Sequence, residues 1–374
     1  MKKSTKWLVF GVLMVIFAFG IFLEWLYPPL PKYTGEITLN ALQKEVEVYT
    51  DDYGVPHIFA NNEKDLFFVA GYIAARERLF QLSMVALAVK GELASVLGDS
   101  YLKTDIYLRT WRIQKVAEQL VKAMKPKNKL IFDSFCNGIN QWIEESKNDL
   151  PVEFKILRME PSLWSPVIVA GYTRMMAHEM SGSWKPEIVF GAVGEYFGKE
   201  KLLELIPESK FDLPSIAKVD SEMLSPIYTE VLNQEIQLRN LFGDFSADIG
   251  SNSWVVSGQK TITGKPFLAN DPHLAFSQPP RWYEIHLKGG RFNVSGYCLA
   301  GIPMPVIGQN ENTAWGFTNS MVDDLDFFIE KINPSNKDQY LYGGEWKTFL
   351  REKEVIPLKS GKDTTIVVRT SVHG

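Results

Sequence analysis

The apolar pattern of the chain changes near residue 250, and this change limits the folds that it can adopt. Before that point apolar residues recur at helical spacing, as in residues 63–97, "EKDLFFVAGYIAARERLFQLSMVALAVKGELASVLG". After it come short alternating runs separated by turn residues, such as "RWYEIHL" and "RFNVSGYCL". The pattern predicts an α+β fold, with residues 28–250 mainly helical and residues 251–374 mainly sheet.

Other tracts are assigned in the same way. Further helices are expected over about 111–147, broken near Pro126, and over 164–206, where "SGSWKP" separates two of them. Short strands are expected over 34–60, with a turn at "DDYG", and "KGG" predicts a hairpin turn. Residues 207–250 are expected to be mixed and partly looped. From "TAWGFTN" on, the runs "DLDFFIEKI", "REKEVIPLK" and "TTIVVRTSV" are further strand candidates.

Composition excludes several classes of protein. Hydrophobic residues make up 45% of the 374 and charged residues 22%, which is typical of a globular protein with a sizeable core. The net charge of −4 gives no basic surface, so nucleic acid is not an expected partner. Cys136 and Cys298 are the only cysteines, so neither a disulfide framework nor a thiolate zinc site is expected. A single disulfide between them stays open.

The N-terminus indicates export. Three lysines precede an unbroken apolar run from Trp7 to Leu23. The length of this run suits either a short membrane span or a long signal-peptide core. Residues 1–27 are therefore predicted to be a membrane anchor or a removed signal peptide. Because lysines stay on the cytoplasmic side, the rest of the chain is expected on the periplasmic or extracytoplasmic face, anchored through residues 7–23.

Common catalytic motifs are absent from the sequence. It contains no HExxH, no GxxxxGK[ST] and no GxSxG, so a zinc protease, a P-loop enzyme and an α/β-hydrolase are not supported. The five histidines are dispersed along the chain. Any hydrolytic site must therefore activate its nucleophile in another way.

The stretch "SADIGSNSWVVSG" offers such a way at the point where the pattern changes. A serine hydroxyl is a weak nucleophile until a base removes its proton. If the chain is cut between Gly250 and Ser251, the new α-amine, with an ordinary pKa of about 8, can be that base. Glycine before the cut suits the strained geometry in which the hydroxyl reaches the carbonyl. The other interpretation of this dipeptide is a surface turn before a strand.

The context of the junction resembles the penicillin acylase family of N-terminal-nucleophile hydrolases. The resemblance rests on "GSNSWVVSG", "LANDPHL" and "WGFTNSMVDDLDFFIEKI", and upstream on "DDYGVPHIFA", "GYIAARERLFQL", "KGELASVLG" and "LPVEF". It implies an exported precursor (a zymogen) that cuts itself into two chains, which stay associated. It also implies an αββα sandwich, incomplete here, and hydrolysis of the amide bond of small N-acylated substrates.

The resemblance assigns roles to individual residues. Ser251 matches the nucleophile, Gly250 the residue before the cut, and His273 a residue that orients the nucleophile's amine. Asn319 matches the residue whose backbone N–H stabilises the oxyanion. Histidine at position 273 is commoner in relatives that act on aliphatic acyl groups and cephalosporin side chains, which disfavours penicillin G itself.

A calcium site and an acyl pocket are also implied. The calcium ligands would be Glu187, Asp323, Leu325 through its carbonyl, and Asp326, all hard oxygen donors. The alternative interpretation is that the aspartates cap a turn before a strand. The pocket would be lined by Leu274, Ile307, Phe317 and Met180, the last with spacing offset by about one residue from the family. No organic cofactor is expected.

Two alternatives to a penicillin acylase stay open. One is an acyl-homoserine lactone acylase (quorum quenching), which uses the same chemistry, and the other is an unprocessed, non-catalytic, membrane-tethered binding protein. The chain ends at "RTSVHG", where members of the family continue for several hundred residues. The missing part would include the second oxyanion donor, so the sequence is expected to be either a fragment of a longer reading frame or a truncated product, and to be inactive alone.

Overall fold

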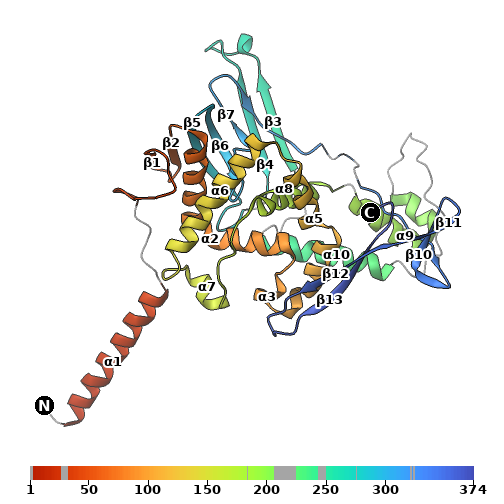
Figure 1. The fold of residues 1–374 in the computed structure, drawn as a ribbon, viewed down its shortest axis with the longest axis horizontal. Coiled ribbons are helices and arrows are strands. Elements are labelled where there is room, and N and C mark those ends of the chain that lie inside the picture. Colours follow the sequence, from red (N-terminus) through yellow and green to blue (C-terminus); the bar gives the residue numbers. More distant parts are fainter. Residues whose placement is uncertain are drawn as a thin grey trace. The chain divides into compact units, whose positions relative to one another are not determined.

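The structure is a computed structural model that describes residues 3–26, 33–182, 184–205, 225–242, 250–274, 276–320, 322 and 325–374. The chain divides into two compact units. Unit 1 contains residues 1–87, 120–169 and 282–314, and unit 2 contains residues 88–119, 170–281 and 315–374. Each unit combines helices with strands (Figure 1), which confirms the predicted α+β class. The predicted division of the chain at residue 250 refers to a cleavage point, which these units do not test, so it stays a prediction.

Unit 1 is organised around a six-stranded sheet of order β1-β2-β5-β6-β7-β8. Its strands are β1 (Glu47–Thr50), β2 (Pro56–Phe59), β5 (Trp282–Gly289), β6 (Phe292–Leu299), β7 (Ile307–Gln309) and β8 (Ala314–Trp315). β2 and β5 are parallel, whereas β1–β2, β5–β6 and β6–β7 are antiparallel. Tyr283, Ile285 and Leu287 alternate along β5 and are all buried, so one face of this strand lies in the core.

Two long helices of unit 1 touch through their backbones. They are α2 (Glu63–Lys90) and α6 (Pro126–Glu145). A Cβ added to Gly71 would overlap the carbonyl oxygen of Phe135, and one added to Gly138 would overlap that of Phe68. Glycine is therefore required at both positions, because a larger residue would separate the helices.

The start of α2 is fixed by polar contacts. Asn62 Oδ1 accepts a hydrogen bond from the N–H of Asp65 at 2.8 Å, which is a typical N-cap. The buried Asp65 carboxylate in turn accepts from the N–H groups of Gln43 and Lys44, both at 3.0 Å. The helix and the segment that precedes β1 are thus tied together.

The N-terminal segment forms helix α1 (Lys3–Leu26). Among the residues that the structure describes, no helix combines the length and the apolar character needed to cross a membrane. The anchor at residues 7–23 stays a prediction. Cys136 and Cys298 are both free and buried, so the disulfide left open by the sequence is not formed. Burial raises the pKa of both thiols, that of Cys298 to about 12.

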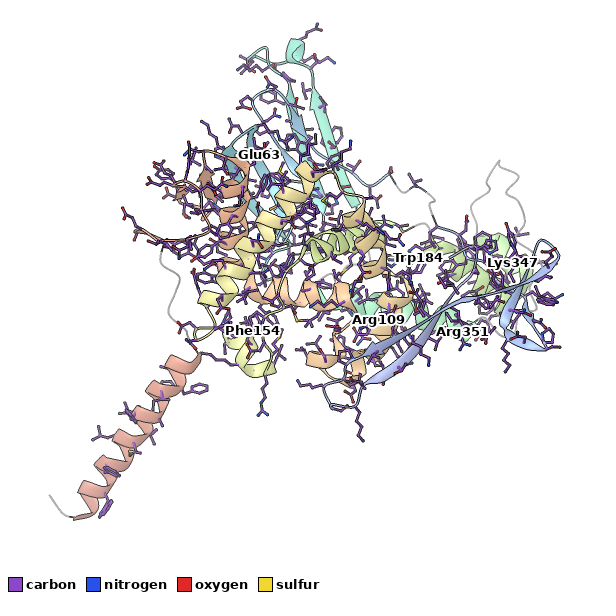
Figure 2. The ribbon with its side chains drawn as sticks, viewed as in Figure 1. Glu63, Arg109, Phe154, Trp184, Lys347 and Arg351 are labelled. Carbon is purple, nitrogen blue, oxygen red and sulfur yellow. The ribbon has the colours of Figure 1, made fainter. Side chains whose placement is uncertain are left out.

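Unit 2 contains a helical cluster held by buried polar groups. Its helices are α3 (Ala94–Leu97), α4 (Leu102–Thr110), α8 (Pro166–Met180), α9 (Trp184–Leu205) and α10 (Ser225–Leu241), with α5 (Ile113–Lys122) beginning in this unit. The buried Glu235 of α10 bonds Lys185 Nζ of α9 at 2.7 Å. Tyr107 of α4 donates to the same carboxylate at 3.3 Å and contacts His178 at 2.8 Å. Trp184, labelled in Figure 2, is fully buried beside this group.

The strands of unit 2 form three small sheets. These are the pair β3 (Gly250–Val256) and β4 (Phe267–His273), the triple β9 (Ile332–Asn333), β10 (Asn336–Tyr342) and β11 (Glu345–Thr348), and the pair β12 (Leu350–Ile356) and β13 (Thr364–Thr370). The strands in these sheets pair antiparallel. Figure 1 shows β12 and β13 as a long hairpin.

Several elements differ from the sequence prediction. The helix expected over 63–97 ends at Lys90, because Gly91 has a φ of +62°, and helix resumes as α3. A strand was predicted over "DLDFFIEKI", but the described residues of this run that precede the short β9 do not form one. Five further elements were not predicted from the sequence: α4, α7 (Val152–Leu157), β7, β10 and β11.

Candidate active site

The Gly250–Ser251 junction lies at the start of β3, where it pairs with the end of β4. The register places Gly250 opposite His273 and Ser251 opposite Pro272. The runs "SWVV" and "FLAN" supply the aromatic and aliphatic residues that suit two pleated strands. Pairing of these strands therefore brings the histidine of "DPHL" next to the predicted cleavage point.

Ser251 is contacted by a segment from much later in the chain. Its Oγ accepts a hydrogen bond from the backbone N–H of Asn319, with an N–O distance of 3.4 Å. The Asn319 side chain donates to the carbonyl oxygen of Met180 at 2.6 Å. Met180 is the last residue of α8, where carbonyl groups lack partners within the helix, so this side chain caps the helix end. Three predicted site residues from three parts of the chain thus meet.

This contact is suited to stabilising an oxyanion. A carbonyl attacked by Ser251 Oγ would develop its negative charge beside that oxygen, within reach of the Asn319 N–H. A backbone donor needs no reorientation at the moment of reaction, since its position is set by the surrounding fold.

His273 lies beside the residue that precedes the predicted cut. Its Nε2 lies 3.0 Å from Asp271 Oδ2 and 3.4 Å from Asn252 Nδ2, and the ring tautomer decides which of these groups it bonds. A Cβ placed on Gly250 would lie 3.4 Å from Nδ1, so this nitrogen faces the residue before the predicted cut. The Asp271–His273 pair is well exposed and contributes little to stability.

Sequence reasoning missed Asn270. This residue of β4 hydrogen bonds the backbone of Phe317 through both of its amide atoms, at 3.1 Å each, and the carbonyl of Asn252 at 3.0 Å. It stands in "LANDPHL", three residues before His273, but nothing in that string shows what its side chain contacts.

The predicted pocket residues are placed in both units. Leu274 follows β4, Met180 ends α8 and Phe317 precedes Asn319, all in unit 2, whereas Ile307 begins β7 in unit 1. Phe317 is 59% exposed, so its ring is not part of the core. These positions leave the acyl-pocket assignment a prediction.

The predicted calcium ligands are only partly described. Glu187 lies in the first turn of α9, and Leu325 and Asp326 lie on the segment before β9, while Asp323 falls outside the described residues. Trp184 and Phe327 are in ring contact at 6.0 Å, which joins the start of α9 to the residue after Asp326. Across the described parts of the chain, no three carboxylate, histidine or cysteine side chains are grouped as a metal site. The oxygen donors fit calcium chemically.

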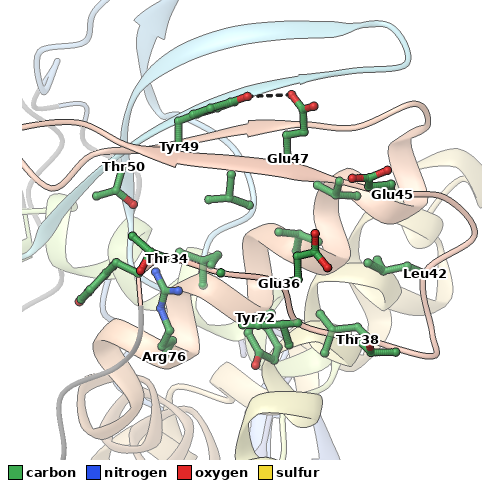
Figure 3. Close-up of a pocket in the computed structure, with 18 residues that line it drawn as sticks. Thr34, Glu36, Thr38, Leu42, Glu45, Glu47, Tyr49, Thr50, Tyr72 and Arg76 are labelled. Atoms are coloured by element: carbon green, nitrogen blue, oxygen red, sulfur yellow. Dashed lines mark hydrogen bonds between the residues drawn. The ribbon is translucent and has the colours of Figure 1, made fainter.

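Unit 1 contains a separate cavity of about 670 Å³ (Figure 3). It lies between residues 33–50 and α2, with Arg76 and Tyr72 at its base. None of the described candidate site residues lines it. The cavity is therefore distinct from the Ser251 site.

Comparison with known proteins agrees with the sequence resemblance. Residues 45–374 match the penicillin amidase family, and the chain belongs to this family. It is 28% identical to "Acyl-homoserine lactone acylase QuiP" of Pseudomonas fluorescens (strain Pf0-1), with 92% of this chain and 43% of that protein covered. It is 26% identical to "Penicillin G acylase" of Escherichia coli, covering 88% and 45%, and 27% identical to "Penicillin acylase 2 proenzyme" of Pseudomonas sp. (strain SE83), covering 94% and 46%.

A solved structure, "Thermostable Penicillin G acylase from Alcaligenes faecalis in tetragonal form", shares 26% identity with a TM-score of 0.40, covering 47% of this chain and 97% of that one. The chain spans less than half the length of the curated relatives described above. Membership of the family rests on the match over residues 45–374.

Proposed function

We propose that the protein is a self-processing amidohydrolase that cleaves the amide bond of small N-acylated substrates, with Ser251 as its N-terminal nucleophile. One observation carries the proposal: the backbone N–H of Asn319 hydrogen bonds Ser251 Oγ at the junction between the helical and strand-rich parts. A turn serine would not need a donor supplied by a segment so distant in sequence. Family membership supports the same reaction class.

Processing would begin with attack of Ser251 Oγ on the carbonyl carbon of Gly250. The C–N bond to Ser251 breaks, an ester to Oγ forms, and the hydroxyl proton ends on the Ser251 nitrogen. Water then hydrolyses the ester, which leaves a Gly250 carboxylate and a free Ser251 α-amine. The resemblance gives His273, which stands opposite Gly250 in the strand register, the role of orienting the Ser251 amine once it is free.

Substrate hydrolysis would follow the same pattern in the mature protein. The Ser251 α-amine takes the proton from Oγ, which attacks the substrate amide carbon, and the Asn319 N–H donates to the resulting oxyanion. The amine proton passes to the leaving amine as the C–N bond breaks. Water then releases the acid and restores the free hydroxyl.

A calcium ion is proposed as a structural partner, held by Glu187, Asp326, the Leu325 carbonyl and Asp323. The ring contact between Trp184 and Phe327 supports this assignment, because it brings the two ligand-bearing segments together. The ion would fix the segment that follows Asn319 and would take no part in bond breaking.

The substrate class has two candidates that share this chemistry. Penicillin-type amides with an aliphatic acyl group agree with histidine at position 273. N-acyl-homoserine lactones are the second candidate, supported by the relatives named acyl-homoserine lactone acylase. In both, the enzyme recognises an acyl group and releases a small amine.

The test uses the full gene product and two matched variants. Wild type, Ser251→Ala and Ser253→Ala are expressed in parallel, since Ser253 is an exposed serine of the same strand. We expect wild type and Ser253→Ala to yield two chains, one beginning at Ser251 by mass spectrometry, and Ser251→Ala to stay a single chain. Release of free amine from N-acyl-homoserine lactones, aliphatic cephalosporins and penicillin G then ranks the substrates.

Two outcomes would overturn the proposal. An uncut wild-type chain without activity would support a binding protein instead. Two chains in Ser251→Ala would show that another protease makes the cut.

A further inference from the structure

The Asn270 side chain joins two backbone segments that the proposed reaction must keep aligned. Its Nδ2 donates to the carbonyl oxygens of Asn252 at 3.0 Å and of Phe317 at 3.1 Å. Its Oδ1 accepts from the Phe317 N–H at 3.1 Å. By pairing with both backbone groups of Phe317, the amide behaves like one more residue of a neighbouring strand.

The two bonded segments carry the nucleophile and the oxyanion donor. Asn252 directly follows Ser251, and Phe317 stands two residues before Asn319. A shift of either segment would therefore change the 3.4 Å distance between the Asn319 nitrogen and Ser251 Oγ. Because Asn270 of β4 bonds both segments, its side chain controls this distance.

Gly316 allows the close approach that these bonds require. A Cβ at this position would lie 2.7 Å from Asn270 Cβ and 2.8 Å from both Cγ and Oδ1. Real carbon atoms do not approach so closely, so any larger residue would push the Asn270 amide away from Phe317. The glycine of "WGFTN" and the asparagine of "LANDPHL" thus form one structural unit.

We infer that Asn270 is a positioning residue of the acyl-transfer reaction, which holds the Asn319 N–H over the nucleophile. The inference rests on the proposed function. It assigns Asn270 no contact with substrate and no proton transfer. Asn319 is also held by its bond to the Met180 carbonyl, so loss of Asn270 should loosen the donor without releasing the whole segment.

The experiment compares three variants with wild type in the full gene product. Asn270→Ala removes the amide, and Asn270→Asp keeps the acceptor but replaces the donor. Asn336→Ala removes an asparagine of β10 whose Oδ1 accepts the nearby N–H of Asp338. Processed sites are counted by titration with phenylmethylsulfonyl fluoride. Rates are then given per titrated site, which separates positioning from folding and processing.

The expected result is a loss in kcat with little change in KM. Asn270→Ala should lower kcat per site by about 10- to 100-fold, because oxyanion stabilisation depends steeply on donor position. KM should stay within about 3-fold, since the ground-state substrate gains little from this N–H. Asn336→Ala should match wild type.

Asn270→Asp provides a readout that a purely structural role would not move. A protonated carboxyl can donate to the Phe317 carbonyl, whereas a carboxylate would repel it. The ratio of the variant's kcat to that of wild type should therefore rise as the pH falls through the titration of the new carboxyl. Gly316→Ala, which displaces Asn270 by contact, should resemble Asn270→Ala and serves if that variant fails to process.

Failure of the inference can be told from failure of the proposed function. An inactive wild type without a Ser251 terminus would refute the function. An active wild type with unchanged kcat per site in both Asn270→Ala and Gly316→Ala would overturn the positioning role alone. Fewer titratable sites at unchanged kcat would also overturn it, because Asn270 would then serve only folding or processing.

Discussion

Replacement of Asp105 tests the balance between burial and hydrogen bonding inside unit 2. The carboxylate is fully buried and accepts the N–H groups of Leu93 at 2.8 Å and Ala94 at 2.7 Å. Burial raises the pKa of Asp105 to about 6, against the lowering effect of these two bonds and of Arg109. The folded chain therefore holds a proton at pH values where the unfolded chain has released it.

The sign and size of the effect follow from this pKa. Because the folded value lies above the ordinary 3.8, the stabilising contribution of the bound proton is complete below pH 3.8 and is lost as the pH rises through about 6. At about 1.36 kcal/mol per pH unit, the difference amounts to about 3 kcal/mol. Asp105→Asn cannot titrate, so the unfolding free energy of wild type minus that of the variant should fall by about 3 kcal/mol from well below pH 3.8 to pH 7, and by about 2 kcal/mol between pH 4 and pH 7.

The assay is guanidinium unfolding followed by tryptophan fluorescence at several pH values. Taking the difference between the two proteins cancels the titration of all other groups. Asp363→Asn, which changes an exposed carboxylate of the same unit, is the matched control. A pH-independent difference for Asp105→Asn would refute the reasoning, because it would mean that the two backbone N–H groups fully offset the effect of burial.

Two further predictions concern the helix crossing and the proposed metal. Gly138→Ala should lower the unfolding free energy by about 3 kcal/mol or more, because its methyl group would overlap the Phe68 carbonyl, a backbone group that cannot move aside. Thermal unfolding measures this loss. The control Gly182→Ala, which has open space around it, should stay within about 0.5 kcal/mol of wild type. Calcium should raise the thermal midpoint of the full gene product by several degrees and do so less in Asp326→Asn; an equal response in both proteins would remove Asp326 from the ligand set.

The elements that the sequence predicts well are those with a local cause. Strands β3, β4, β5 and β6 follow from short alternating runs, and the break between α5 and α6 follows from Pro126. The end of α2 is harder to predict, because Leu93 and Ala94 beyond it are buried and continue the apolar pattern of the helix. What ends the helix is backbone geometry at Gly91, which an apolar pattern does not report.

Helix α4 was also missed, because an apolar pattern does not reveal a helix that is buried through polar contacts. Its sequence, "LKTDIYLRT", mixes apolar and polar residues, and its buried residues include the polar Thr104 and Asp105. Thr104 contacts Gln234 at 2.9 Å, and Asp105 satisfies the N–H groups left open after Gly91. A helix that is buried through polar partners cannot be recognised until those partners are known.

The candidate site has some features with a local cause in the sequence and others that depend on distant contacts. The reactive groups stand in short strings, so Ser251 and its preceding glycine can be proposed from local sequence. The distance between nucleophile and donor depends instead on Asn270, whose partners lie on β3 and beyond β8, and no one-dimensional spacing encodes that alignment. Because an acyl-transfer site fails when its donor is displaced by about 1 Å, such side-chain bonds to distant backbone matter as much as the motif itself. Asn270 and Gly316 are therefore the positions at which substitution should separate the presence of a nucleophile from its use.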